Sequence, residues 1–189
     1  MENIILVGYG GHAKSVADCI ERMGQYKIVG YTDQEDNHAV FPYLGKDDVL
    51  AEYLEKGCNK VAICIGYLGK GRIREVLYEK LKAMGFEFPV IIDPTAIISK
   101  SANIGEGTFV GKGAIINAEA TIGKMCIINT RALVEHESEV RDFTHVAVDA
   151  VLCGQVKVGK AALIGANATV IQCRTVGERQ IVPAGAVIR

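Results

Sequence analysis

The apolar positions of this chain follow two different periods. In the first ninety residues, short β-rich runs alternate with stretches in which apolar residues recur at helical spacing. The runs Ile4–Val7, Lys27–Tyr31 and Lys60–Ile65 are predicted strands. One helix is predicted after the first strand and another after the third, and the second ends before Gly85. The core-facing residues of the first helix are Val16, Cys19, Ile20 and Met23, and those of the second are Ile73, Val76, Leu77, Leu81 and Met84. Strands alternating with helices predict a small α/β domain with an open parallel sheet.

From Val90 onward, an aliphatic residue returns every six positions without a gap. The ladder starts at Ile92 and ends at Ile188. A mostly small residue stands two positions before each member, at Ala96, Ala102, Thr108, Ala114, Ala120, Cys126, Ala132, Ser138, Thr144, Ala150, Ala162, Ala168 and Ala186. A fixed period of this kind is typical of a β-helix, in which stacked coils share one apolar interior.

Glycine often follows directly after a ladder residue, at Gly105, Gly111, Gly123, Gly159, Gly165 and Gly177. We expect these glycines to adopt turn conformations that other residues resist. With three hexads to a coil of eighteen residues, Ala118 lies one coil below His136 and Gly154 one coil above, at a strand separation of about 4.8 Å.

The charge balance is even, with 21 basic and 22 acidic residues, so no single-sign field is available to attract nucleic acid or an anionic membrane. The six cysteines form no CxxC pair, which disfavours a disulfide framework and a structural zinc site. The first apolar run meets Gly8 too early for a signal-peptide core or a membrane span. We therefore expect a cytoplasmic, soluble protein with no metal.

Charged residues interrupt the repeat at Glu135, His136 and Glu137. A neutral imidazole is suited to remove a proton from an attacking amine or hydroxyl, and an adjacent carboxylate can fix its tautomer. A backbone N–H at Gly154 can stabilise the oxyanion of an acyl transfer. The alternatives are a purely structural solenoid with surface histidines at His136 and His145, or an acyl-carrying nucleophile at Cys153, although half-buried cysteines usually act as small hydrophobes.

The stretch from Ile128 to Gly165, INTRALVEHESEVRDFTHVAVDAVLCGQVKVGKAALIG, together with the opening GYGGH, resembles bacterial nucleotide-sugar acetyltransferases of the bacillosamine type and the related sialic-acid O-acetyltransferases. These proteins are hexapeptide-repeat enzymes with a left-handed β-helix. The resemblance covers essentially the whole chain.

The resemblance implies a role for several residues. His136 is the general base, Glu137 raises its basicity, and Gly154 offers its amide to the thioester oxygen of acetyl-CoA. Other acetyl-CoA contacts fall on His145, Ala166 and Ala184. Asp149 is a departure, because it puts a charge where the relatives have none.

The opening GYGGHA also has a chemical interpretation of its own. Gly8, Gly10 and Ala13 have the G-x-G-x-x-A spacing between a strand and a helix, and Asp33 ends the next strand, as in a dinucleotide fold. NAD is therefore one interpretation, but about eighty-five residues are too few for a full dinucleotide fold. The resemblance instead implies a nucleotide sugar held by Gly10, Gly11 and His12, with Thr32 and Asp33 at the base and Gly66 lining the same cleft.

Taken together, the sequence predicts a Rossmann-like α/β domain over residues 1–88 that binds a nucleotide sugar, and a left-handed β-helix over residues 89–189. The expected activity is acetyl-CoA-dependent N-acetylation of a nucleotide-linked amino sugar, of the UDP-4-amino-4,6-dideoxy type, by direct transfer. Two alternatives are sugar O-acetylation and a nucleotide-sugar-binding scaffold without turnover. The resemblance also implies a homotrimer with acetyl-CoA in a groove between neighbouring subunits.

Overall fold

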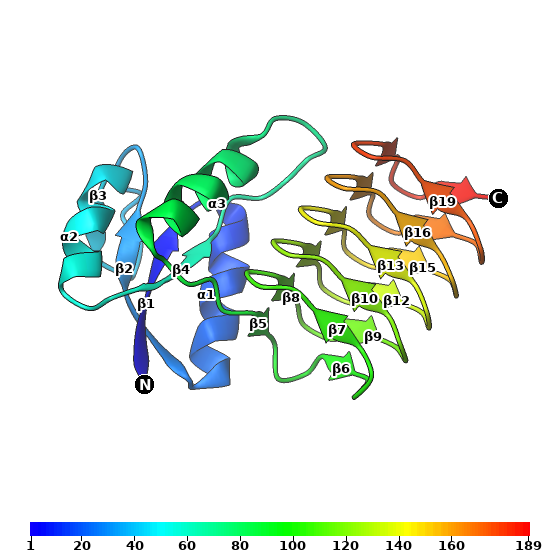
Figure 1. Ribbon diagram of the computed structural model, residues 1–189, viewed down its shortest axis with the longest axis horizontal. Helices are drawn as coiled ribbons and strands as arrows, with labels where there is room; N and C mark the ends of the chain where they lie inside the picture. The colour runs from blue at the N-terminus through cyan, green and yellow to red at the C-terminus, as the bar shows by residue number, and fades with distance from the viewer. The chain divides into compact units, whose positions relative to one another are not determined.

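The computed structural model describes all 189 residues and divides into two compact units (Figure 1). The first unit comprises Met1–Gly66 and Arg72–Pro89, and the second comprises Tyr67–Gly71 and Val90–Arg189. The short segment Tyr67–Gly71 therefore groups with the repeats, although it lies between elements of the first unit in the sequence. No helix of the chain has the length and apolar character needed to cross a membrane.

The first unit is a parallel four-stranded sheet with the strand order β3-β2-β1-β4. Its elements are β1 (Glu2–Val7), α1 (Gly11–Met23), β2 (Tyr26–Thr32), β3 (Tyr43–Gly45), the 3₁₀ helix η1 (Asp47–Val49), α2 (Leu50–Glu55), β4 (Lys60–Ile63) and α3 (Ile73–Met84). The predicted α/β domain is confirmed. The sequence pattern missed β3 because its three residues carry no apolar alternation.

The face that α3 buries differs from the prediction. Ile73 and Val76 are 52% and 58% exposed, whereas Leu77, Tyr78 and Leu81 are buried. The buried set still has helical spacing, but it is rotated so that an aromatic residue replaces the two β-branched ones. The predicted stop is confirmed, because Gly85 caps the helix with a left-handed φ of 101°.

The second unit is a parallel β-helix of two-residue strands, with one strand of each coil on each of three faces (Figure 1). Each strand pairs with the strand eighteen residues further on, as Ile127 does with His145, so the predicted coil length is confirmed. The fold is the predicted left-handed β-helix. The first face holds β5 (Ile91–Ile92), β8 (Phe109–Val110), β11 (Ile127–Ile128), β14 (His145–Val146), β17 (Leu163–Ile164) and β20 (Ile181–Val182).

The other two faces follow the same rule. The second face holds β6 (Ile97–Ile98), β9 (Ile115–Ile116), β12 (Leu133–Val134), β15 (Val151–Leu152), β18 (Thr169–Val170) and β21 (Val187–Ile188). The third face holds β7 (Asn103–Ile104), β10 (Thr121–Ile122), β13 (Glu139–Val140), β16 (Lys157–Val158) and β19 (Thr175–Val176). The ladder residues and most of the small residues form one interior cluster, which confirms their predicted place.

Glycine occurs after the ladder residues for a different reason from the one predicted. None of the six has a positive φ. Instead, a Cβ at Gly159 would lie 2.4 Å from the backbone nitrogen of Glu178, and a Cβ at Gly165 would lie 2.4 Å from that of Ala184. Backbone atoms of the next coil would also lie within 2.9 Å of a Cβ at Gly105, Gly111 or Gly123, so five of the six glycines allow that coil to approach closely, whereas Gly177 faces only the Gln180 side chain. The left-handed positions come two residues later, recur every six residues, and are mostly occupied by side chains other than glycine.

Candidate functional site

The Glu135-His136-Glu137 triplet forms a corner of the prism. It follows β12 on the second face and precedes β13 on the third face. We call this corner and its equivalents in other coils the second corner; the first corner joins the first and second faces, and the third corner joins the third and first. Glu137 has a left-handed φ of 57°, so the chain turns sharply directly after the histidine.

The two side chains His136 and Glu137 are paired. His136 Nδ1 lies 3.0 Å from Glu137 Oε2, and the side chains are 56% and 48% exposed. A carboxylate only accepts, so Nδ1 donates and a neutral ring keeps its lone pair on Nε2. The hydrogen bond from His136, and then that from Gln155, holds the pKa of Glu137 below its ordinary value. A charged carboxylate thus fixes the tautomer that a general base requires.

Gly154 lies against the free side of this imidazole. A Cβ at Gly154 would lie 2.6 Å from His136 Nε2 and 2.7 Å from Cε1. The neighbouring backbone bonds use the N–H groups of Cys153 and Gln155 and the carbonyl of Gly154, and they leave the Gly154 N–H unused. The structure therefore brings the His136 imidazole and a backbone N–H together, as the eighteen-residue spacing predicts, and the role of His136 as a base stays a prediction.

Polar side chains extend this arrangement into the coils above and below. Glu135 accepts a hydrogen bond from the His136 N–H at 3.1 Å and another from Asn117 Nδ2 at 2.9 Å. Above Glu137, Gln155 Nε2 donates to Glu137 Oε2 at 3.2 Å. A surface groove of about 490 Å³ lies beside them, lined by Glu137, Gln155, Lys157, Cys173 and Thr175.

His145 has different surroundings. It is 8% exposed, and its Nδ1 lies 2.7 Å from the carbonyl oxygen of Tyr67. Because a carbonyl only accepts, Nδ1 donates, and Nε2 of a neutral ring accepts from Asn129 Nδ2 at 3.1 Å. The Tyr67 hydroxyl in turn donates to the carbonyl of Ala161 at 2.6 Å. In this structure His145 holds the segment Tyr67–Gly71 onto the repeats, and its contact with acetyl-CoA stays a prediction.

The two alanines predicted to contact acetyl-CoA are exposed and lie in successive coils. The Gly185 N–H donates to the carbonyl of Ala166 at 2.8 Å, which places Ala184 directly beside Ala166. Both belong to the first corner, whereas His136 and Gly154 belong to the second. One chain therefore does not bring the predicted cofactor contacts and the predicted base onto the same corner.

In the first unit, the glycine-rich loop connects β1 to α1. Gly8 has a φ of 86°, and a Cβ there would lie 2.8 Å from the Ile65 side chain, so both conformation and space require glycine. Gly10 caps α1 and Gly11 is its first residue, and open space surrounds both. A backbone that is open at a helix N-terminus is suited to approach a phosphate.

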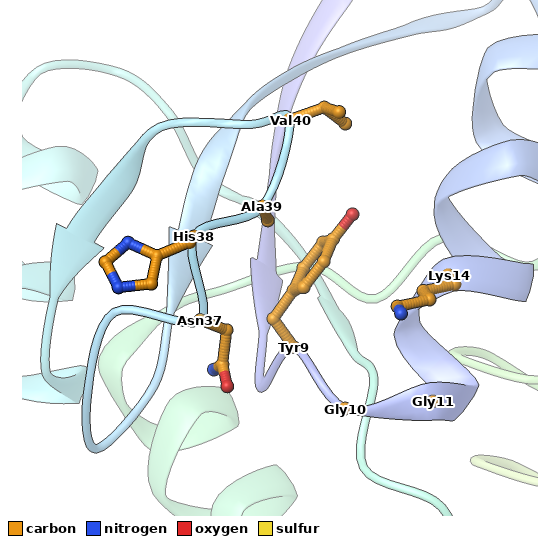
Figure 2. Close-up of a pocket in the computed structure, with 8 residues that line it drawn as sticks. All are labelled: Tyr9, Gly10, Gly11, Lys14, Asn37, His38, Ala39 and Val40. Atoms are coloured by element: carbon orange, nitrogen blue, oxygen red, sulfur yellow. The ribbon is translucent and has the colours of Figure 1, made fainter.

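A hollow of about 510 Å³ adjoins this loop (Figure 2). The Tyr9 side chain stands between the start of α1, which carries Lys14, and the segment Asn37–Val40. A second, smaller cavity of about 230 Å³ lies at the carboxyl ends of β1, β2 and β4 and is lined by Val7, Gly8, Asp33, Gln34, Asp47, Ile65, Ile73 and Leu77. In open parallel sheets, ligands bind at this edge.

The two residues predicted at the base have different environments. Asp33 borders the smaller cavity, but its carboxylate accepts hydrogen bonds from the N–H groups of Tyr9 and Gln34 at 2.8 and 2.7 Å, so it also fixes the glycine loop. Thr32 is fully buried, and its hydroxyl donates to Asp47 at 2.6 Å. Thr32 therefore has no surface to offer a ligand, and it acts on the cavity only through Asp47.

Gly66 and His12 lie side by side, as predicted for residues of one cleft. A Cβ at Gly66 would lie 3.6 Å from the His12 Cβ, and Gly66 is exposed. Three further polar residues of this corner, Gln155, Cys173 and Asn117, were not predicted, although all three lie at multiples of eighteen residues from Glu137 or Glu135 and that spacing points to them. Tyr67 could not have been found in this way, because it lies outside the repeats.

Comparison with known proteins identifies relatives of both units. The family model described as the PglD N-terminal domain matches residues 3–81. The UDP-N-acetylbacillosamine N-acetyltransferase of Bacillus subtilis (strain 168) is 38% identical over 115 residues, which are 58% of this chain and 51% of that protein. The matched part therefore spans about half the length of this curated relative.

Several solved structures match the whole chain, and two of them illustrate the similarity. One is a histidine-to-asparagine variant of perosamine N-acetyltransferase from Caulobacter crescentus in complex with CoA and GDP-perosamine, with a TM-score of 0.93, 33% identity and coverage of 100% of this chain and 89% of that one. The other is the acetyltransferase domain of PglB from Neisseria gonorrhoeae FA1090, with a TM-score of 0.92, 32% identity and coverage of 100% and 92%.

Proposed function

Because this chain belongs to the family of bacillosamine-type nucleotide-sugar acetyltransferases, we propose that it acetylates the amine of a nucleotide-linked amino sugar with acetyl-CoA. The observation that carries the proposal is the pairing of His136 with Glu137 beneath the unused N–H of Gly154. These are the three groups that direct acyl transfer needs, namely a base, a group that orients it and an oxyanion donor.

The proposed reaction has no covalent enzyme intermediate. His136 Nε2 takes a proton from the sugar amine as the amine nitrogen attacks the thioester carbonyl carbon. The Gly154 N–H donates to the oxygen that becomes negative, which is worth roughly 3 kcal/mol for one preorganised donor. The intermediate then collapses, the carbon–sulfur bond breaks, and CoA leaves as its thiolate.

We assign the nucleotide sugar to the first unit. The diphosphate would approach Gly10, Gly11 and His12 at the N-terminus of α1, where Lys14 supplies a positive charge next to the open backbone. Asp33 and Gly66 would border the same ligand. UDP is the first nucleotide to test and GDP the second, because the curated relative is named for a UDP sugar and the Caulobacter structure contains a GDP sugar.

We infer a homotrimer with acetyl-CoA held between neighbouring copies. The predicted acetyl-CoA contacts Ala166 and Ala184 lie on a different corner from His136, which supports a site completed by a second copy. The outward column of the second face is apolar except for one threonine, and consists of Ile97, Ile115, Leu133, Val151, Thr169 and Val187. The six free cysteines suit the reducing cytoplasm, where we place the enzyme.

The proposal is tested by measuring thiol release from acetyl-CoA with UDP-, GDP- and dTDP-linked amino sugars, with the His136→Ala protein run in parallel. Removing a general base should lower turnover by roughly 10²- to 10⁴-fold. Release with one amino sugar that is lost in the variant supports N-acetylation with His136 as the base. Transfer to a hydroxyl acceptor, or acetyl-CoA binding without transfer to any acceptor, would contradict it.

A further inference from the structure

Three side chains in successive coils form a column on the second corner. They are Glu137, Gln155 and Cys173, spaced by eighteen residues, and their φ values of 57°, 61° and 59° are nearly identical. Backbone hydrogen bonds hold the column in register, from the Gln155 N–H to the His136 carbonyl at 2.9 Å and from the Cys173 N–H to the Gly154 carbonyl at 3.0 Å. The backbone hydrogen bonds between coils therefore fix the Cα position of each of these three residues.

The side chains of this column form a directed chain of hydrogen bonds. Cys173 Sγ lies 3.2 Å from Gln155 Oε1, and Gln155 Nε2 lies 3.2 Å from Glu137 Oε2. The carboxylate can only accept, so the amide must present its nitrogen to Glu137 and its oxygen to the thiol. The thiol donor therefore favours the same amide orientation that the carboxylate requires.

The amide acts on the oxygen that orients the histidine. Glu137 Oε2 accepts both from His136 Nδ1 and from Gln155 Nε2. The other acidic side chain of the corner, Glu135, is engaged with the His136 N–H and with Asn117, so it does not restrain Glu137. Because Glu137 is 48% exposed, it would otherwise have freedom to rotate into water.

We propose that Gln155 is a positioning residue that holds Glu137 against His136, and that Cys173 fixes the orientation of the Gln155 amide. The inference rests on the proposed role of His136 as the base. Gln155 contacts neither ring nitrogen of His136 and acts only through Glu137. Its effect should therefore appear in the chemical step rather than in the binding of either substrate.

The first test replaces Gln155 with a side chain of similar length that has no donor. In Gln155→Met we expect kcat to fall roughly 5- to 50-fold, as for loss of one hydrogen bond to a charged group, with both KM values within about twofold of the wild type. Gln155 is exposed, so the variant should fold normally. An unchanged kcat, or a loss confined to KM, would overturn the proposal.

A double-mutant cycle separates positioning from a general structural effect. In a Glu137→Ala background, adding Gln155→Met should cause no further loss of kcat, because its target is already gone. An equal further loss would mean that Gln155 acts by another route. The matched control is Glu119→Ala, which removes a side chain from the equivalent left-handed position one coil below Glu137 and should leave kcat unchanged.

The role of the Cys173 thiol is tested by comparing two substitutions at that position. Cys173→Ser keeps a donor toward Gln155 Oε1 and should retain more of the wild-type kcat than Cys173→Ala, whereas equal rates would overturn the role of Cys173. His136→Ala is measured in the same series. Full activity of His136→Ala would contradict the proposed function, because His136 would then not be the base. An inactive His136→Ala protein together with a fully active Gln155→Met protein would contradict only the role of Gln155.

Discussion

The imidazole of His136 occupies the space that a side chain at position 154 would fill, since a Cβ there would lie 2.6 Å from Nε2. The absence of a side chain thus does two things at once. It leaves room for the ring beside the next coil, and it places Gly154 next to the nitrogen proposed to accept the proton.

Gly154→Ala should lower activity without unfolding the protein. Position 154 has no positive φ, so alanine is compatible with the backbone, and the three atoms nearest to the new methyl group all belong to the His136 ring, which can rotate away. Because a shift of about 1 Å in a reacting group can cost about 10²-fold, we expect kcat to fall roughly 10- to 100-fold. Steady-state kinetics and urea unfolding would measure the two effects.

Gly159→Ala is the matched control for this change. Its methyl group would meet the backbone of Gly177 and Glu178 at 2.7 and 2.4 Å, which cannot move without distorting a coil. We expect a loss of about 1–3 kcal/mol in the free energy of unfolding, typical of overpacking. If Gly154→Ala and Gly159→Ala lowered the free energy of unfolding equally, the explanation that the His136 ring can move while the backbone at Gly177 and Glu178 cannot would be wrong.

The apolar column on the second face should carry the assembly. Leu133 points outward from β12 and is half-buried in the single chain, and we expect Leu133→Glu to weaken association by burying a charge. Sedimentation velocity should show a shift from trimer to monomer, with the circular dichroism spectrum unchanged. Thr121→Glu on the polar third face is the control, and a trimer that persists in Leu133→Glu would rule out this face.

Asp149, where the resemblance predicts no charge, forms an ion pair within the chain. Its Oδ1 lies 2.9 Å from Arg131 Nε one coil below, and the side chains are 36% and 72% exposed. Exposed pairs of this kind contribute at most about 1 kcal/mol. Asp149→Asn keeps a residue that tolerates the left-handed φ of 56°, so we expect a small change in the unfolding free energy and an unchanged KM for acetyl-CoA.

A raised KM for acetyl-CoA in Asp149→Asn would show that this carboxylate acts on the cofactor. Arg131→Gln tests the same pair from its other side. If the ion pair is the main interaction of Asp149, the two single variants and the double variant should have similar unfolding free energies.

Burial raises the pKa of the Cys64 thiol from its ordinary 9.0 to about 12. Above pH 9 the unfolded chain loses this proton while the folded chain keeps it, so the unfolded state binds fewer protons. The free energy of unfolding should therefore fall as pH rises from about 9 toward 12, with a contribution of roughly 1 kcal/mol per pH unit.

Urea unfolding of the wild type and Cys64→Ser between pH 8 and pH 10.5 would isolate this contribution, because serine does not ionise in that range. We expect the wild-type stability to fall more steeply. Parallel curves would mean that Cys64 ionises normally in the folded protein.

The β-helix could be predicted because its pattern is local and repeated. Each ladder position faces the same interior, so the six-residue period is written in the chain from Ile92 to Ile188. The same count gives the stacking of His136 under Gly154. The role of the glycines could not be predicted from the period. Glycine next to a turn can serve either a positive φ or the close approach of another backbone segment, and the contacts of Gly159 and Gly165 show that the second explanation holds.

The sequence by itself determined the two folds, the coil length and the pairing of His136 with Glu137, because these depend on residues that are adjacent or evenly spaced. Only the tertiary structure decided that His145 is bonded to Tyr67, 78 residues away, and that Thr32 faces Asp47 inside the sheet unit. Such contacts depend on how loops fold back onto regular elements. That path is set by many weak interactions between distant residues, which no periodic pattern records.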